Sequence, residues 1–357
     1  MTVNGQMAYH ILLISLETLA IFSLFLIVFI ILYRYVSSRR DRWFQYHYKR
    51  ITDELLEMLT SQDPQAPEFL ATRNKNFTGP LTDALLDLAR RIKGPERKKL
   101  TIVFELALKD RVRKDLSSPF ILRRLVAARL LEFFSESAEL EIIQRLLKDK
   151  PPVRLAAISA LANSASGQSL RYILQSLEKD PAPNYQSYLE ILFPLGETLE
   201  NELRAALQRP LRPELIAFYV ELAGIIPLRR LFPDLLPLAT HENKEIRIKT
   251  ARALARMELP ESFPILKALA NDPAWEVQAQ AVIGLGRLKN PEALPLLCQA
   301  LRSPYWHVRL NAKEALLLLG QPGLDCLKNT ARQSQDRFAA EMAMMGLREY
   351  EEFYQKI

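Results

Sequence analysis

The sequence predicts an all-α protein, in which an N-terminal transmembrane helix is followed by a right-handed α-solenoid of helical-hairpin repeats. Residues 19–32 are almost all Leu, Ile, Phe or Val, and a second hydrophobic pattern recurs about every 31 residues from residue 117 onward. Glycine is scarce, with 11 residues, whereas 22 prolines interrupt a chain rich in Leu and Ala. Such a composition is typical of many short helices with marked starts.

The apolar run near the N-terminus has the length and composition of a membrane-spanning helix. Twelve of the fourteen residues from Leu19 to Leu32 are Leu, Ile, Phe or Val. On an insertion scale they favour the bilayer by about 4–7 kcal/mol. A cleaved signal peptide is disfavoured, because no Lys or Arg precedes the run and no small-residue cleavage site follows it. We therefore assign residues 1–36 to a tail and a transmembrane helix.

Basic and aromatic residues follow the apolar run and define a juxtamembrane segment, residues 37–50. Residues 1–10 contain no Lys or Arg, whereas residues 34–50 contain six of them and one acid. The positive-inside rule then places the N-terminus outside and the rest of the chain in the cytoplasm, as in a single-pass protein of the bacterial inner membrane. The segment either only sets this topology or also meets lipid headgroups, through Arg39, Arg40, Arg42, Trp43 and Tyr46.

Glu17 is the one acidic residue in the N-terminal segment. If the span covers residues 11–33, this carboxylate lies inside the membrane and needs a partner. If the span covers residues 18–35, it lies at the outer interface, and the remaining helix still extends about 27 Å. We favour the interfacial position. The alternative is a contact with the transmembrane helix of another protein.

Residues 51–116 are predicted to form a divergent helical cap at the N-terminal end of the solenoid. The stretches "ITDELLEMLTS", "GPLTDALLDLARRI" and "PERKKLTIVFELALKDRV" have amphipathic helical patterns with Thr or Pro near their starts. Between the first two, residues 61–76 contain several polar residues and two prolines. This stretch is predicted to be a mobile loop.

Residues 117–357 are predicted to be the repeat solenoid, with a C-terminal capping helix. Anchor residues recur 30–32 positions apart, at Leu122, Val153, Tyr185, Ile216, Ile246, Val277, Val308 and Ala339. Residues four and eight positions later lie on the same helical face, and these columns are rich in small residues and in Leu, respectively. Four anchors are followed by an arginine: Arg123, Arg154, Arg247 and Arg309. One hairpin cannot bury its own face, so neighbouring hairpins must stack.

The stretch "DPAWEVQAQAVIGLGRLKNPEALPLLCQAL", residues 272–301, resembles a HEAT-like repeat of the short bacterial kind, which also occurs in phycobilisome lyase-type proteins. The matching features are the Asp-Pro turn, the small residues of the first helix and the Leu-rich second helix. The resemblance extends over roughly residues 117–350 and is best at the anchors Val153, Ile246, Val277 and Val308. It implies a stacked-hairpin fold and says little about function.

No residue pattern indicates catalysis or a cofactor. The two cysteines, Cys298 and Cys326, are expected to be buried, unpaired and typical of a reducing compartment. Gly284 and Gly286 suggest a dinucleotide loop, but the third glycine is missing and the flanking residues have a helical register. We therefore expect these glycines to allow close helix packing. The sequence predicts no catalytic, cofactor-binding or metal-ligating residue, and thus a protein that is not an enzyme.

Trp275 and Trp306 occupy the same position in consecutive repeats, and His307 follows the second one. We expect these aromatic residues mainly to stack between repeats. The alternative is an aromatic rim that contacts a partner, so Trp275, Trp306 and His307 join Glu17 as candidate partner contacts.

The combination of an anchor and a solenoid predicts a membrane-tethered, non-catalytic scaffold or adaptor. Its expected partner is an integral membrane protein or complex, for example a bacterial exopolysaccharide glycosyltransferase. Two alternatives remain: an enzyme of the bilin lyase type, whose members share these repeats, or a HEAT-like nucleic-acid-binding protein. Nucleic acid is disfavoured because the basic residues of the solenoid are scattered.

Overall fold

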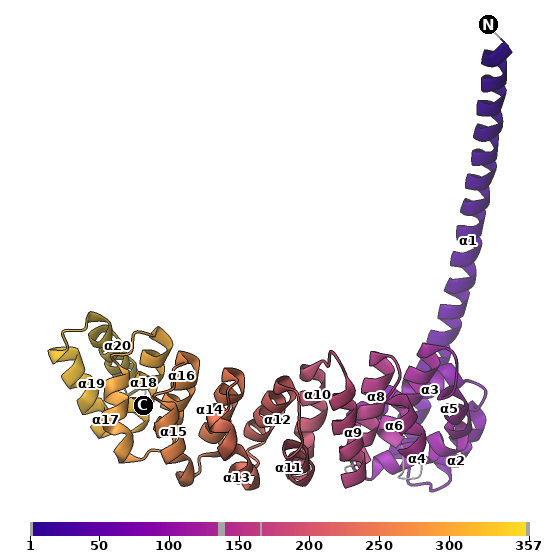
Figure 1. Cartoon of the computed structure of the whole chain (residues 1–357). Helices are drawn as coiled ribbons and strands as arrows, with labels where there is room; N and C mark the ends of the chain where they lie inside the picture. Colours follow the sequence, from indigo (N-terminus) through magenta and orange to yellow (C-terminus); the bar gives the residue numbers. More distant parts are fainter. Residues whose placement is uncertain (1–2, 135–139, 165, 355–357) are drawn as a thin grey trace. The chain divides into compact units, whose positions relative to one another are not determined.

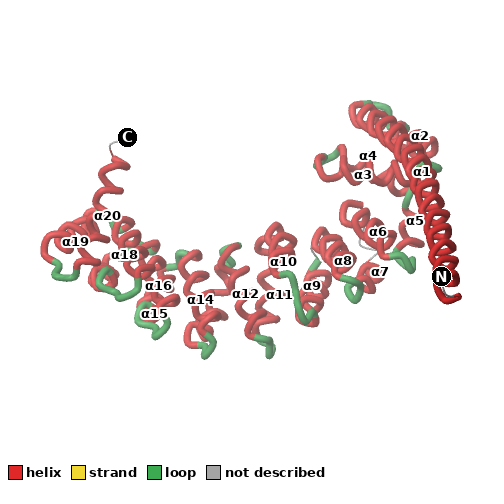
Figure 2. Tube along the Cα trace, turned by 90° about the horizontal axis from the view of Figure 1, so that it is seen from above, coloured by secondary structure: helices red, strands yellow, loops and turns green. Residues whose placement is uncertain are grey.

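The computed structural model describes residues 3–134, 140–164 and 166–354. The chain divides into two compact units, residues 1–136 and 137–357, which we describe separately. The described residues contain helices and no strands, and short loops join the helices (Figures 1 and 2). The predicted all-helical fold is thus confirmed.

The first unit contains six α-helices among its described residues: α1 (Val3–Thr60), α2 (Ala66–Asn74), α3 (Thr78–Arg91), α4 (Glu96–Ala107), α5 (Lys109–Asp115) and α6 (Ile121–Phe134). The prediction of a loop over residues 61–76 is wrong, because most of this stretch forms α2. Leu70 and Ala71 of this helix are buried, so it contributes to the core of the unit despite its polar composition.

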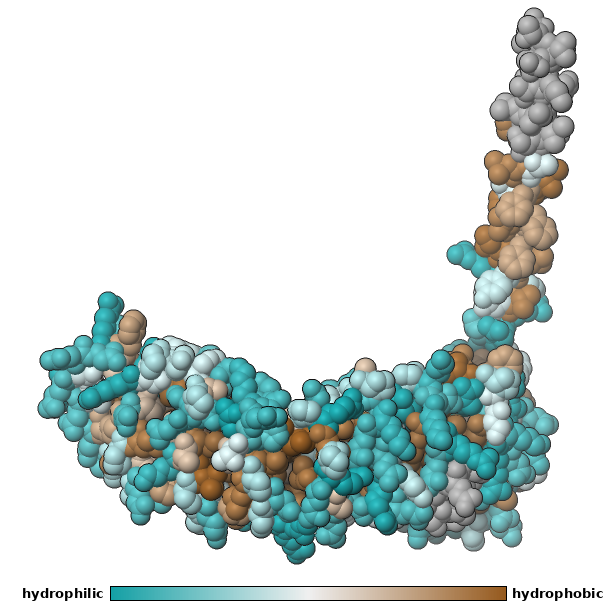
Figure 3. All heavy atoms as spheres, viewed as in Figure 1, coloured by the Kyte–Doolittle hydropathy of each residue, from teal (hydrophilic) through white to brown (hydrophobic). Residues whose placement is uncertain are grey.

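Helix α1 is one continuous helix that changes character along its length. From residue 21 to residue 36 its large apolar side chains are exposed, and Figure 3 shows a hydrophobic surface on the part of α1 that projects away from the rest of the unit. Further along the same helix, the side chains on one face are buried against neighbouring helices: Ile51, Leu55 and Met58. The ammonium group of Lys99 on α4 donates a hydrogen bond of 2.6 Å to the carbonyl of Ser61 and holds the end of α1.

The second unit consists of helical hairpins whose first and second helices alternate along the chain. The first helices are α8 (Pro151–Ser164), α10 (Tyr185–Leu192), α12 (Pro213–Ile225), α14 (Lys244–Met257), α16 (Trp275–Arg287), α18 (Trp306–Leu318) and α20 (Arg337–Tyr354). The second helices are α7 (Leu140–Leu146), α9 (Gly167–Lys179), α11 (Glu200–Leu207), α13 (Phe232–Leu235), α15 (Phe263–Leu269), α17 (Leu294–Ala300) and α19 (Gln321–Gln333).

First helices of successive repeats pack very closely because small residues face each other. A Cβ atom added to Gly286 on α16 would lie 2.4 Å from the Cα atom of Ala315 on α18. One added to Gly284 would lie 2.8 Å from the Cβ atom of Ala255 on α14. Both distances are shorter than van der Waals contact, so only glycine fits. This confirms that the two glycines serve helix packing.

Three first helices are followed by a residue with a positive φ angle, and these residues are one repeat apart. Within two residues of the ends of α14, α16 and α18 lie Glu258, Lys289 and Gly320, with φ angles of 51°, 52° and 68°. Glu258 has a ψ angle of 35° and lies in the left-handed helical region, which costs about 1–2 kcal/mol for a residue other than glycine. Gly320 has a ψ angle of −137° and lies in a different region, which glycine tolerates. A positive φ angle thus recurs after these three first helices, although only Gly320 is a glycine.

In two repeats, an arginine after the anchor binds the aspartate of the next turn. Arg247 donates to both carboxylate oxygens of Asp272, at 2.7 and 2.9 Å, and to the carbonyl of His241 at 2.8 Å. Arg154 makes a single hydrogen bond of 2.5 Å to Asp180 at the corresponding place. The Val-Arg and Asp-Pro features of the sequence are therefore two halves of one cross-repeat contact.

The predicted register is wrong by one residue at two repeats. Arg124, and not Arg123, donates to the turn carbonyl six residues earlier, as Arg247 does, and the predicted anchor Leu122 is 70% exposed. In the repeat anchored at Tyr185, the buried side chains are Tyr188 and Leu192. The repeat anchored at Tyr185 lacks the Val-Arg signature, and the repeat anchored at Leu122 has two adjacent arginines. The sequence therefore did not define a unique register for these two repeats.

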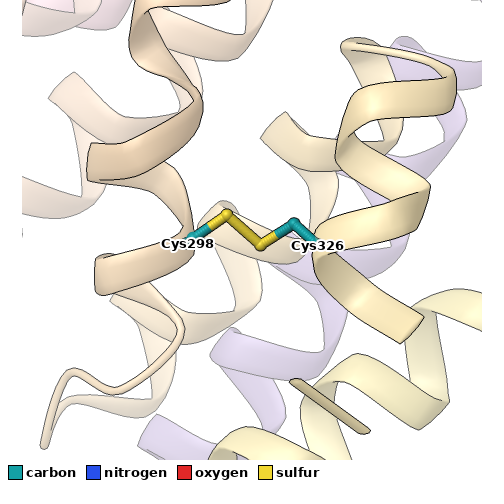
Figure 4. The surroundings of a disulfide bond; sticks show 2 residues. All are labelled: Cys298 and Cys326. Atoms are coloured by element: carbon teal, nitrogen blue, oxygen red, sulfur yellow. A yellow bond between two sulfur atoms is a disulfide. The ribbon is translucent and has the colours of Figure 1, made fainter. Parts of the chain in front are cut away.

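The prediction that the two cysteines are buried and unpaired is also wrong. Cys298 on α17 and Cys326 on α19 are half-buried and form a disulfide bond, with their Cα atoms 6.3 Å apart (Figure 4). Their sequence separation is 28 residues, about one helical turn less than the repeat period. Because the pair does not occupy equivalent repeat positions, the periodicity did not reveal it.

Helix α20 closes the second unit, as its amphipathic pattern predicted. Ala339, Met342 and Ala343 are buried on one face of this helix. Lys313 on α18 is almost fully buried, and its ammonium group forms ion pairs with Glu314 and with Glu349 of α20. The buried charge therefore has its compensating carboxylates, as a desolvated lysine requires.

Candidate partner-binding surface

An aromatic cluster lies where α16 and α18 begin. Trp275 is the first residue of α16, and its ring stacks on that of Tyr305 in the next turn, with centroids 5.9 Å apart. The same ring stacks on His307 of α18, at 5.0 Å. Trp275 thus joins two successive repeats, and Tyr305 is a member that the sequence did not single out.

Trp306 has a different environment from Trp275, although both begin a first helix. Its ring meets His307 edge-on, with centroids 5.0 Å apart. Trp306 is 51% exposed and Tyr305 42% exposed. The cluster therefore has an inner member that stacks between repeats and an outer edge of large, accessible rings.

The cluster borders a hollow on the face formed by the first helices α14, α16 and α18. Its volume is about 430 Å³, and it is open to solvent. The lining combines both charges, amides and aromatic rings, and comprises Glu245, Ile248, Arg252, Trp275, Glu276, Ala279, Gln280, His307 and Asn311. This mixture suits a protein surface with hydrogen-bonding groups better than a purely apolar ligand.

Polar contacts between repeats hold the lining of the hollow in place. The side-chain amide of Asn311 donates to the carbonyl of Ala279 at 2.7 Å, and Lys244 pairs with Glu276 at 2.8 Å. The hydrogen bond from Lys244 lowers the pKa of Glu276, and the same bond raises the pKa of Lys244. Both groups therefore remain charged near neutral pH.

The predicted membrane-interface residues lie together on α1, just before this helix joins the core of the first unit. The guanidinium group of Arg39 lies over the ring of Tyr35 at 5.0 Å, Arg40 is 4.0 Å from Asp41, and Arg42 donates to the carbonyl of Ser38. All of these contacts are within α1 and close to solvent. The cationic groups are thus accessible to other molecules.

The aromatic members of this juxtamembrane group lie between the exposed part of α1 and the core. Trp43 is 49% exposed, and its ring is 6.1 Å from that of Phe77, at the start of α3. Tyr46 remains exposed and contacts only the edge of His47 among the described rings. His47 in turn stacks on Phe77 at 4.3 Å. Trp43 therefore serves packing as well as the surface, which the sequence did not indicate.

Two further expectations concern chemistry and the N-terminal acid. The side chain of Glu17 lies outside the described residues, so its proposed contacts stay a prediction. Among the described residues, no group of three or more His, Cys, Asp or Glu side chains could hold a metal ion.

The family model of HEAT repeats matches residues 264–348, which include the hollow's α16 and α18. Among curated proteins, no sequence matches the chain. Within the part of the chain that the structure describes, one helix, α1, is long and apolar enough to cross a membrane by length and composition, and none of its apolar window is buried.

Several solved repeat structures are similar to the chain. The YibA protein of Escherichia coli is 18% identical, with coverage of 81% of this chain and 98% of that chain and a TM-score of 0.33. The CpcE and CpcF complex of phycocyanin lyase from Nostoc is 17% identical, with coverage of 69% and 87% and a TM-score of 0.26. Human deoxyhypusine hydroxylase is 17% identical, with coverage of 86% and 98% and a TM-score of 0.29. Because these scores are low, we infer nothing about function from them.

Proposed function

We propose that this chain, which carries HEAT repeats, is a membrane-tethered, non-catalytic scaffold that binds a protein partner through the first-helix face of α14, α16 and α18. The observation that carries the proposal is the exposed edge of Tyr305 and Trp306 beside the polar hollow. Large aromatic rings next to fixed polar groups are characteristic of the residues that dominate protein–protein affinity.

The exposed apolar surface of α1 supports the membrane tether. Leu, Ile, Phe and Val side chains between residues 21 and 32 are 40–69% exposed all around the helix. A soluble protein rarely exposes so much contiguous apolar surface, whereas the hydrocarbon core of a bilayer covers it favourably. A helix compatible with a membrane anchor is therefore present, and the cationic residues beyond it suit anionic headgroups.

The proposed location is the bacterial inner membrane, with the N-terminus outside and both compact units in the cytoplasm. The support is the charge asymmetry between residues 1–10 and residues 34–50. The disulfide between Cys298 and Cys326 favours the opposite side, because disulfides persist mainly in oxidising compartments. If the proposed orientation is right, both residues are free thiols in the cell.

The proposed partner is another membrane protein or complex, with a bacterial exopolysaccharide glycosyltransferase as the example reached by analogy. The anchor confines the solenoid to the membrane, which raises its effective concentration near membrane partners without any additional contact. A modest aromatic surface is then sufficient for stable association.

Purification of the full chain in mild detergent, followed by mass spectrometry of the associated proteins, tests this proposal. We expect integral membrane proteins to be enriched with the natural chain and lost with a Tyr305→Ala/Trp306→Ala variant. Phe193 is 52% exposed on another part of the second unit, so Phe193→Ala is the matched control and should keep the partners. Equal recovery with all three chains would show that the aromatic edge is not the binding surface.

Proteolysis of spheroplasts tests the orientation. Protease added from outside should leave residues 51–357 intact if both units are cytoplasmic. Digestion of this portion would reverse the proposed topology, and modification of intact cells by a membrane-impermeant thiol reagent after reduction would do the same.

A further inference from the structure

Grooves open between the second helices because the first helices pack so closely. α16 packs extensively on both α14 and α18, whereas α15 and α17 make few mutual contacts. One groove, of about 330 Å³, lies between α15 and α17, and a similar one, of about 320 Å³, lies between α7 and α9. The second groove is named here the α7–α9 groove.

The two grooves have equivalent linings but different charges. Four repeats separate them, and the α7–α9 residues Arg154, Ser176 and Lys179 correspond to Gln278, Ala300 and Ser303. Three cationic side chains line the α7–α9 groove against one acid, in the set Gln144, Leu147, Lys148, Arg154, Tyr172, Gln175, Ser176, Lys179 and Asp180. The repeat architecture therefore produces the groove, and substitutions specific to this repeat make it positive.

The cations of the α7–α9 groove are only partly used by the protein. Arg247 binds a carboxylate with two nitrogens and a turn carbonyl with the third, whereas Arg154 has one hydrogen bond, from Nη2 to Asp180. Lys148 and Lys179 are exposed and form no ion pair with a described residue. Three positive charges thus converge on the groove with one carboxylate to balance them.

Polar groups beneath the groove also lack well-formed hydrogen bonds. Within the described part of the chain, Arg154 Nε, Ser176 Oγ and the hydroxyl of Tyr188 are buried without a hydrogen bond. Tyr188 is 1% exposed, and burial raises the pKa of its hydroxyl, which lies beside Ser176 and Arg154. Buried polar groups are normally paired, so these three neighbouring groups, which contact one another without a well-formed hydrogen bond, indicate a place where a polar ligand completes the network.

From this geometry we propose that the α7–α9 groove binds a small phosphorylated molecule. Arg154 and the two lysines meet the phosphate oxygens, while Leu147 and the ring of Tyr172 contact the carbon skeleton. A guanidinium group and two ammonium groups provide the charge-assisted bonds that phosphate requires. The volume lies at the small end of natural ligand sites.

Calorimetric titration of the full chain tests the site, with the chain held in phosphatidylcholine nanodiscs so that the lipid carries no net charge. Inorganic pyrophosphate is the probe, and citrate is the matched carboxylate of similar charge. We expect pyrophosphate to bind at least about tenfold more tightly than citrate, because tetrahedral oxygens fit the three cations better. Equal binding of the two anions, or no detectable binding of pyrophosphate, overturns the proposal.

Two variants locate the site. Lys148→Gln/Lys179→Ser removes both exposed cations and should weaken pyrophosphate binding by roughly tenfold or more. The control is Arg302→Gln, which removes a cation from the equivalent α15–α17 groove and should leave binding unchanged. Circular dichroism confirms that each variant is folded. If both variants weaken binding equally, the interaction is with the net charge of the chain and the proposed site is wrong.

Discussion

First and second helices of the second unit differ in how they meet their neighbours. The first helices touch through glycine and alanine, so closely that a Cβ atom at Gly286 would lie 2.4 Å from the Cα atom of Ala315. Between the second helices α15 and α17, a groove of about 330 Å³ remains open. The difference teaches that the closest backbone packing lies in the layer of first helices, while the layer of second helices has room for ligands and cross-links.

The largest loss of stability is expected when the contact between Arg247 and Asp272, at the turn between two repeats, is broken. The side chain of Arg247 is 14% exposed and that of Asp272 6% exposed, so Arg247→Gln leaves a buried carboxylate without its cation. We expect the free energy of unfolding to fall by about 3–5 kcal/mol. Urea denaturation of the solubilised chain measures it, and a loss below about 1 kcal/mol would show that solvent reaches Asp272 freely.

Reduction of the disulfide tests whether the stability of the second helices depends on this covalent link rather than on packing. Cross-linking residues 28 apart, Cys298 and Cys326, restricts the unfolded chain. We expect reduction to lower the free energy of unfolding by roughly 3–4 kcal/mol. Chemical denaturation with and without reductant measures the difference. Cys298→Ser/Cys326→Ser is the control, because its stability should not respond to reductant.

Added methyl groups give the most direct comparison of the two layers. Gly286→Ala places a Cβ atom against the backbone of α18, and we expect a loss of about 1–3 kcal/mol of stability. Ala300→Val adds methyl groups beside the open α15–α17 groove, and its effect should stay within about 0.5 kcal/mol. Thermal denaturation of the two variants checks the contrast. Equal losses would mean that the second helices are packed as tightly as the first.

The smallest effect is the pH dependence of the Arg247–Asp272 contact. Burial alone would raise the pKa of Asp272, but the hydrogen bonds from Arg247 and from the amide of Ala274 lower it below its usual value of 3.8. The carboxylate therefore stabilises the fold fully above the pKa of the unfolded chain, and this contribution is lost as the pH falls through the lower, folded pKa. Denaturation between about pH 5 and pH 2 should show the decline, and Asp272→Asn should flatten it.

The sequence predicted features that depend on spacing along one helix or on the repeat period. The apolar run of α1, the stacking of α16 on α18 and the purpose of Gly284 and Gly286 all followed from such spacing. Contacts that do not follow the repeat period could not be predicted in this way. The disulfide joins non-equivalent positions, Tyr305 contributes to the aromatic cluster from a turn, and the α7–α9 groove depends on the separation of second helices, which no single helix encodes.

Local composition was also misleading where tertiary packing dominates. The polar stretch that contains α2 looks like a loop, yet Leu70 and Ala71 anchor it in the core. Asn74, at the end of the same helix, is fully buried and receives a hydrogen bond of 2.9 Å from Arg50 of α1. Such long-range partners compensate for weak intrinsic helix propensity, and they are invisible in a window of sequence.

Because α1 is one continuous helix, it is stiff along its length. It has 58 residues, and at the helical rise it extends about 87 Å from Val3 to its last turn beside Lys99. Because no glycine or proline interrupts it after residue 5, a tilt or rotation of the apolar segment moves the attached first unit by the same angle. Insertion of one residue near residue 38 would rotate the core of the first unit by about 100° around the axis of α1.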